Sequence, residues 1–152
     1  SRDFPKLMRK MLPEIGSPHM NLVICSFGYK RGVPVDADMV LDMRFAENPY
    51  YVPELRRLSG LDQPVIDFLK DKPLMEDVLN WTVDLVEKTL PCYEQQGKNL
   101  LRLCFGCTGG RHRSVYAAEA VAHRLREKGI PARVYHRDLT IEAADIESRM
   151  MH

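Results

Sequence analysis

A stretch of glycine and basic residues carries the chemistry that this sequence is best equipped to perform. It runs C-T-G-G-R-H-R-S from Cys107 to Ser114. Adjacent glycines let backbone amides approach a ligand closely, and free amides at the start of a following helix attract an anion. Arginine can hold two phosphate oxygens at once, while threonine and histidine add a donor and a titratable positive charge. The stretch predicts an anion-binding loop, with the expected ligand contacts Thr108, Gly109, Gly110, Arg111, His112 and Arg113.

The same stretch leaves two other interpretations open. Cys107 and Arg113 belong to a C-x-x-G-x-x-R-S pattern similar to the phosphate loop of cysteine-based phosphatases. There a thiolate attacks phosphorus, so Cys107 and Arg113 would be the catalytic residues of such an enzyme. Gly106 stands where those enzymes commonly have histidine. The simplest interpretation is a strand-to-helix turn with solvated cations, but three successive cationic residues oppose the helix dipole, and such local conflicts often mark a site.

Other polar residues follow predicted strands and should therefore lie near this loop. Asp42 could accept a hydrogen bond from a sugar hydroxyl or amine, and Arg44 could support an anion, although an exposed ion pair would also explain them. Tyr50 and Tyr51 could stack on a sugar or simply pack. The remaining expected ligand contacts at strand ends are Ser26, Gly28, Lys30 and His136, of which Gly28 suggests a close backbone approach or a positive φ.

Alternating apolar runs and amphipathic stretches predict the elements that position these residues. Short strands are expected over 22–25, 39–41, 100–105 and 133–135, and helices over 62–69, 74–90 and 114–128. Asp62 and Asp71 are the expected N-caps of the first two helices, and Trp81 is expected in the core or at an interface. This order predicts a single small α/β domain with a mostly parallel sheet, flanking helices and a ligand site at the carboxyl ends of the strands.

Composition sets the outer limits of function. The 152 residues are 45% hydrophobic and 28% charged, and their net charge of +1 argues against wrapping a polyanion. No apolar run is long enough to span a membrane, and no secretory leader is evident. The four cysteines do not form paired metal-ligand spacings, so we expect a reduced cytoplasmic protein without a metal or other cofactor. A break at 16–19 divides an appendage or upstream tail, residues 1–19, from a ligand-binding domain, residues 20–152.

Several motifs in order resemble the C-terminal domain of the RapZ (YvcJ-like) family. They are S-F-G-Y-K at 26–30, D-M-R-F at 42–45, G-C-T-G-G-R-H-R-S at 106–114 and H-R at 136–137. The resemblance implies a non-enzymatic sensor of an amino-sugar phosphate such as glucosamine-6-phosphate. It places the phosphate on 108–113 and Asp42 in the pocket, whereas residue 50 is Tyr where members often have a pocket His. The family's nucleotide-binding domain is not present in this sequence, so nucleotide hydrolysis is not expected.

Partners follow partly from the charge of the C-terminal residues. The family's RNA-adapter members end in a basic tail, whereas residues 138–147 here are acidic and should repel RNA. The expected partner is therefore a small phosphosugar. A third interpretation, suggested by the apolar N-terminal stretch and Trp81, is an interaction module that self-associates or docks onto an upstream kinase-like domain.

Overall fold

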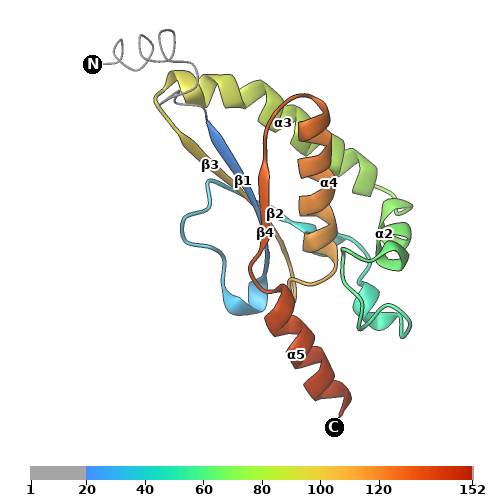
Figure 1. The fold of residues 1–152 in the computed structure, drawn as a ribbon. Coiled ribbons are helices and arrows are strands. Elements are labelled where there is room, and N and C mark those ends of the chain that lie inside the picture. The colour runs from blue at the N-terminus through green and yellow to red at the C-terminus, as the bar shows by residue number, and fades with distance from the viewer. Residues whose placement is uncertain (1–19, 152) are drawn as a thin grey trace.

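A four-stranded parallel sheet forms the centre of the protein. The computed structural model describes residues 20–151, and its strands are β1 (Asn21–Gly28), β2 (Met39–Asp42), β3 (Leu100–Cys107) and β4 (Arg133–His136). Their order across the sheet is β2-β3-β1-β4, and every neighbouring pair is parallel (Figure 1). The predicted α/β class and parallel sheet are confirmed. Expectations for residues 1–15 lie outside the described residues.

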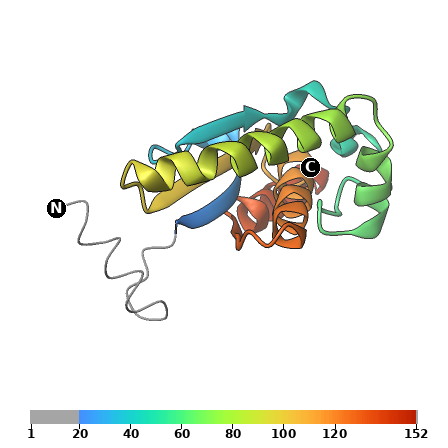
Figure 2. The same cartoon turned by 90° about the horizontal axis from the view of Figure 1, so that it is seen from above.

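Helices cover one face of this sheet and continue past its carboxyl end. They are α2 (Gln63–Lys70), α3 (Met75–Gln95), α4 (Arg113–Glu127) and α5 (Leu139–Met150), and α3 and α4 lie side by side (Figure 2). Leu22, Ile24, Leu101, Leu103 and Phe105 point from β1 and β3 into the main core, where they meet the apolar sides of α3 and α4. Because these strand residues alternate along the chain, they share one sheet face. The two central strands are thus fixed by burial.

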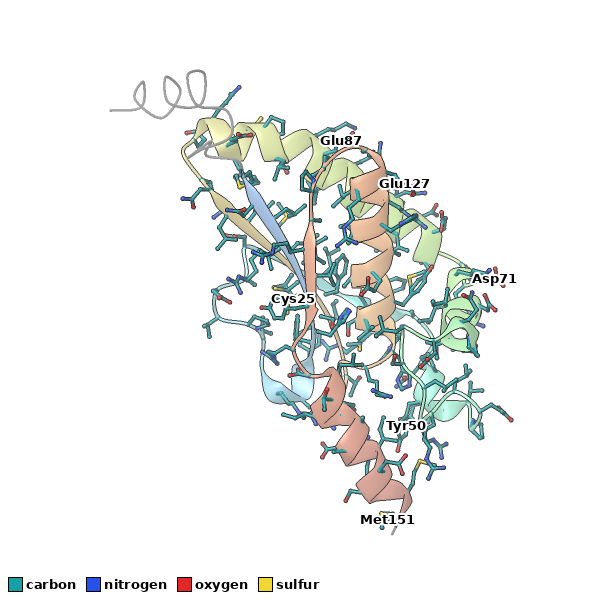
Figure 3. The ribbon with its side chains drawn as sticks, viewed as in Figure 1. Cys25, Tyr50, Asp71, Glu87, Glu127 and Met151 are labelled. Atoms are coloured by element: carbon teal, nitrogen blue, oxygen red, sulfur yellow. The ribbon has the colours of Figure 1, made fainter. Side chains whose placement is uncertain are left out.

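A smaller cluster lies on the other face of the sheet. Cys25 and Cys104 are partners across β1 and β3, both are fully buried, and they pack with Phe27 (Figure 3 labels Cys25). The four cysteines of the chain are all free thiols. Trp81 is not a core residue, because 62% of its surface is exposed on α3.

One of the two predicted helix caps is confirmed, and the other was wrong. Asp62 is the N-cap residue of α2, although its carboxylate accepts the Ser59 N–H at 2.7 Å instead of making a side-chain bond to the helix. Asp71 ends α2, and the residue before α3 is Leu74, whose φ is 68°. Helix α3 also continues through Pro91 to residue 95, five residues beyond its predicted end. The Asp62 carboxylate therefore stabilises the turn before α2 and not the helix itself.

Helix α5 was not predicted, and it projects from the end of the sheet at which β1 and β3 finish (Figure 1). It follows directly after β4 and the turn at 137–138. Asp138 anchors this turn, because its Oδ2 accepts the Gly28 N–H at 2.7 Å and an Arg137 N–H at 2.9 Å. Over residues 20–151, no helix combines the length and apolar character needed to cross a bilayer.

Candidate functional site

A pocket of about 120 Å³ opens at the carboxyl end of β3, beside the glycine-rich loop. The loop, the segment around residue 50 and helix α5 form its walls. The residues that line it are Asn48, Tyr50, Tyr51, Cys107, Thr108, Gly109, Arg111, His112, Arg113, Glu142 and Arg149. The sequence predicted a ligand site from the loop, Tyr50 and Tyr51, but not the contributions of Asn48, Glu142 and Arg149.

Gly28 and the glycine pair form a contact that admits no side chain. A Cβ built on Gly28 would lie 2.4 Å from the carbonyl carbon and oxygen of Gly109 and 2.9 Å from the Gly110 nitrogen. Gly28 has φ −106°, so the predicted close approach is present and the positive φ is not. Gly110 does have a positive φ of 83°. Gly28 and Gly110 therefore shape the loop, and neither lines the pocket.

Arg113 is a buried cation held by uncharged groups. Only 5% of the residue is exposed, although it lines the pocket. Its Nη1 donates to the carbonyls of Ala46 at 2.8 Å and Arg44 at 3.3 Å, and its Nη2 donates to Thr108 Oγ1 at 3.2 Å. Its Nε is buried without a hydrogen-bond partner, and burial lowers the pKa of the guanidinium. Among the described residues, no carboxylate forms an ion pair with it.

Arg111 is also held by carbonyl groups, although it is more exposed than Arg113. Its Nη1 donates to the Leu139 carbonyl at 3.2 Å and its Nη2 to the Arg57 carbonyl at 2.8 Å. The Nε of Arg111 is likewise buried without a partner. Two guanidinium groups thus line one small pocket with uncharged oxygens as their hydrogen-bond partners, an arrangement that favours an anion between them.

The surroundings of His112 oppose the positive charge that its place in the loop suggested. Its Nε2 lies 3.2 Å from the Leu55 carbonyl, which can only accept, so this nitrogen carries the hydrogen. Burial, with a smaller contribution from Arg111, lowers the pKa of His112 below its usual value. The imidazole therefore joins the loop to the segment before α2. His112 also lines the pocket.

Cys107 lies at the base of the loop. It is 3% exposed; its thiol donates to Ser114 Oγ at 3.1 Å, and its sulfur accepts the Ser114 N–H at 3.4 Å. The sulfur therefore faces the first turn of α4 and also lines the pocket. This placement keeps the nucleophile hypothesis open.

Lys30 pairs with carboxylates of helix α5 and is not among the residues that line the pocket. Its Nζ lies 2.5 Å from Glu142 Oε1 and 3.1 Å from Asp145 Oδ2. Arg31 joins the same carboxylates and also donates to the Gly109 carbonyl at 3.2 Å. Lys30 thus holds helix α5 against the loop and does not line the pocket.

The other predicted contacts lie at strand ends outside the pocket. The Arg44 guanidinium donates to both carboxylate oxygens of Asp42 at 2.7–3.1 Å, and these bonds lower the pKa of the carboxyl. Both side chains are about half exposed. Ser26 Oγ lies 2.6 Å from His136 Nδ1, and His136 Nε2 lies 2.9 Å from Glu119 Oε1. Both sets have structural partners here, and their contact with a ligand stays a prediction.

Tyr50 lies at the mouth of the pocket, on the segment beside α5 (Figure 3). The guanidinium carbons of Arg56 and Arg149 lie 5.0 Å and 5.1 Å from the centre of its ring. The neighbouring Tyr51 is 75% exposed and meets Tyr50 edge to face at 5.4 Å. Two rings and the Asn48 amide therefore surround the opening, groups that suit a sugar more than a bare ion. Residues 20–151 contain no cluster of three or more potential metal-binding side chains.

Comparisons with protein families and with curated relatives both match most of the chain. Residues 20–140 match the family model described as the RapZ C-terminal domain. A protein from Rhizorhabdus wittichii is 40% identical over 147 residues, which cover 97% of this chain and 47% of the relative. One from Thermobifida fusca is 46% identical over 116 residues, 76% of this chain and 40% of the relative. Both bear the name "Nucleotide-binding protein", and the chain spans about half the length of these relatives.

Proposed function

We propose that this chain, which belongs to the RapZ C-terminal domain family, binds a phosphorylated amino sugar of the glucosamine-6-phosphate type in the pocket at the end of β3. The observation that carries the proposal is the pair of guanidinium groups of Arg111 and Arg113, which both line this pocket and each have a buried Nε. Each has an Nε without a protein partner, and neither forms an ion pair with a carboxylate of the described residues. A phosphate dianion would balance both charges.

The pocket also supports a ligand larger than phosphate. Its volume of about 120 Å³ suits a phosphate group, while the attached sugar would extend between Tyr50, Tyr51 and Asn48 at the mouth. The family resemblance is what points to an amino sugar. The name of the relatives refers to proteins about twice as long, so a nucleotide is the competing ligand that an experiment should include.

Calorimetry with glucosamine-6-phosphate, glucosamine, inorganic phosphate and ATP tests the proposal. We expect the sugar phosphate to bind more tightly than phosphate, and glucosamine not to bind. Arg113→Gln should weaken binding about 10- to 100-fold, because a charge-assisted hydrogen bond contributes about 1.5–3 kcal/mol. Arg126→Gln is the matched control, since its guanidinium also donates to a carbonyl, that of Ala132, but at the far end of α4. Equal affinity for sugar phosphate and phosphate would exclude specificity for the sugar, and equal effects of the two substitutions would exclude Arg113 from the site.

A cysteine phosphatase is the second candidate, favoured by the Cys107 sulfur beside the Ser114 amide and hydroxyl. In that reaction the thiolate would attack phosphorus and displace the alcohol, and water would then release phosphate from the thiophosphate. An aryl phosphate assay distinguishes the two functions. Turnover that Cys107→Ser abolishes while phosphate binding remains would identify an enzyme, whereas no turnover in the parent would leave the binding function.

A further inference from the structure

Helix α5 adds side chains to the pocket from outside the part of the chain that matches the family model. That match ends at residue 140, whereas Glu142 and Arg149 both line the pocket. The two residues are seven positions apart, about two helical turns, and Ile146 between them is 1% exposed. One face of α5 therefore packs on the domain and presents an acid and a base to the pocket.

Three cations surround the Glu142 carboxylate, and Arg149 contributes least to neutralising it. Glu142, whose side chain is 8% exposed, is approached by Lys30 at 2.5 Å and Arg31 at 3.2 Å, both at Oε1. Arg149 lies at 3.6 Å from Oε2, the longest of the three separations. Glu142 and Asp145 provide two negative charges, while Lys30, Arg31 and Arg149 provide three positive charges. One positive charge is therefore left over, and Arg149, with a side chain 46% exposed, can redirect it most easily.

Arg149, which carries the surplus positive charge, also lines the pocket. Its guanidinium lies 5.1 Å from the centre of the Tyr50 ring and reaches the pocket from α5, whereas Arg113 reaches it from the start of α4. A phosphate in a space of about 120 Å³ would lie within reach of both walls. Exchanging a long contact with Glu142 for a charge-assisted bond to phosphate would leave Glu142 neutralised by Lys30 and Arg31.

We propose that Arg149 is a second phosphate-binding residue, which leaves Glu142 when the ligand enters and thereby fastens the C-terminal half of α5 across the pocket. This inference rests on the proposed function, because it requires an anion between the arginines. The Arg57–Glu147 ion pair, at 2.7 Å, already links α5 to the segment that follows Tyr51. Bound ligand would add a second link next to it.

The test compares the parent chain, Arg149→Gln and Arg133→Gln by calorimetry with inorganic phosphate and glucosamine-6-phosphate. Arg133 is an exposed arginine at the start of β4, at the opposite end of the sheet, so its substitution removes the same charge without touching the pocket. We expect Arg149→Gln to bind both ligands about tenfold more weakly, and Arg133→Gln to bind like the parent. Circular dichroism establishes that the variants are folded.

Hydrogen exchange distinguishes the fastening of α5 from a change in affinity that is caused by the charge of Arg149 alone. Ligand should slow the exchange of amides 146–150 in the parent and in Arg133→Gln, but not in Arg149→Gln. If the parent binds and Arg149→Gln binds equally well, the role of Arg149 is refuted while the proposed function stands. If the parent binds neither ligand, both proposals fail together. Weaker binding without any change in α5 exchange would refute the fastening of the helix.

Discussion

Replacing Gly28 by alanine should destabilise the protein by displacing the loop, and the structure gives the size of the effect. The new Cβ would lie 2.4 Å from the Gly109 carbonyl, whereas ordinary contact begins at 3.4 Å, so the loop must move by about 1 Å. The obstacle is backbone, and Gly28 is itself held by Asp138 through its N–H. Overpacking of this kind costs about 1–3 kcal/mol, and rigid neighbours favour the upper end. Because Gly28 has φ −106°, alanine adds no backbone strain, and the whole loss is steric.

Gly97→Ala is the matched control, because it separates steric cost from conformational cost. Gly97 has φ 89°, and a Cβ added there would meet no atom within 4 Å, so alanine costs only about 1 kcal/mol of backbone strain. Thermal unfolding should therefore give Gly28→Ala a melting temperature about 4–8 °C below that of Gly97→Ala, since 1 kcal/mol shifts a domain of this size by about 2–4 °C. Anion binding should fall only in Gly28→Ala. Equal melting temperatures for the two variants would refute the close contact between β1 and the loop.

Two further stability predictions concern the core and the turn before α5. Leu103→Ala should lower the free energy of unfolding by about 2–5 kcal/mol in urea titrations, because the side chain is fully buried beneath α4; a loss below about 1 kcal/mol would contradict that packing. Asp138→Asn should cost about 1–2 kcal/mol at pH 7, since hydrogen bonds from Arg137 and the Gly28 N–H outweigh burial and hold the pKa of Asp138 below its usual value. This difference should persist above about pH 4 and vanish as pH falls through the folded-state pKa, so a difference independent of pH would be evidence against it.

The sheet could be predicted because its strands are buried on a simple pattern. The runs at 22–25 and 100–105 are apolar and continuous, and breakers separate them from amphipathic helices. Helix α5 escaped prediction because its inward positions are not uniformly apolar. Glu142 occupies one of them, and a carboxylate can be buried there only because Lys30 and Arg31, more than a hundred residues earlier, neutralise it. Periodicity within 139–150 could not reveal that pairing.

Part of the candidate site could be predicted from local sequence, whereas the rest depends on contacts between distant parts of the chain. The loop from Cys107 to Arg113 is evident from its composition, and the structure places most of it around one pocket. Asp42 and Lys30 were expected there because strand ends converge, and in the structure their side chains pair with Arg44 and Glu142 and do not line the pocket. Convergence of strand ends brings residues near one another, and competition among charges then decides which of them face a ligand.

His112 supplies the last prediction, which concerns the pH dependence of binding. If the imidazole met the phosphate, bound anion would raise its pKa, and affinity would increase as pH falls from 8.5 to 6.5. The structure favours the opposite result, because burial lowers the pKa of His112 and its Nε2 hydrogen points to Leu55. Binding should then follow only the second ionisation of phosphate, near pH 6, and affinity should change by about 1.3-fold over this range. Calorimetry on the parent and on His112→Asn should give the same shallow dependence. A steeper increase in the parent that His112→Asn removes would show that a charged His112 contacts the ligand, and the orienting role through Leu55 would be wrong.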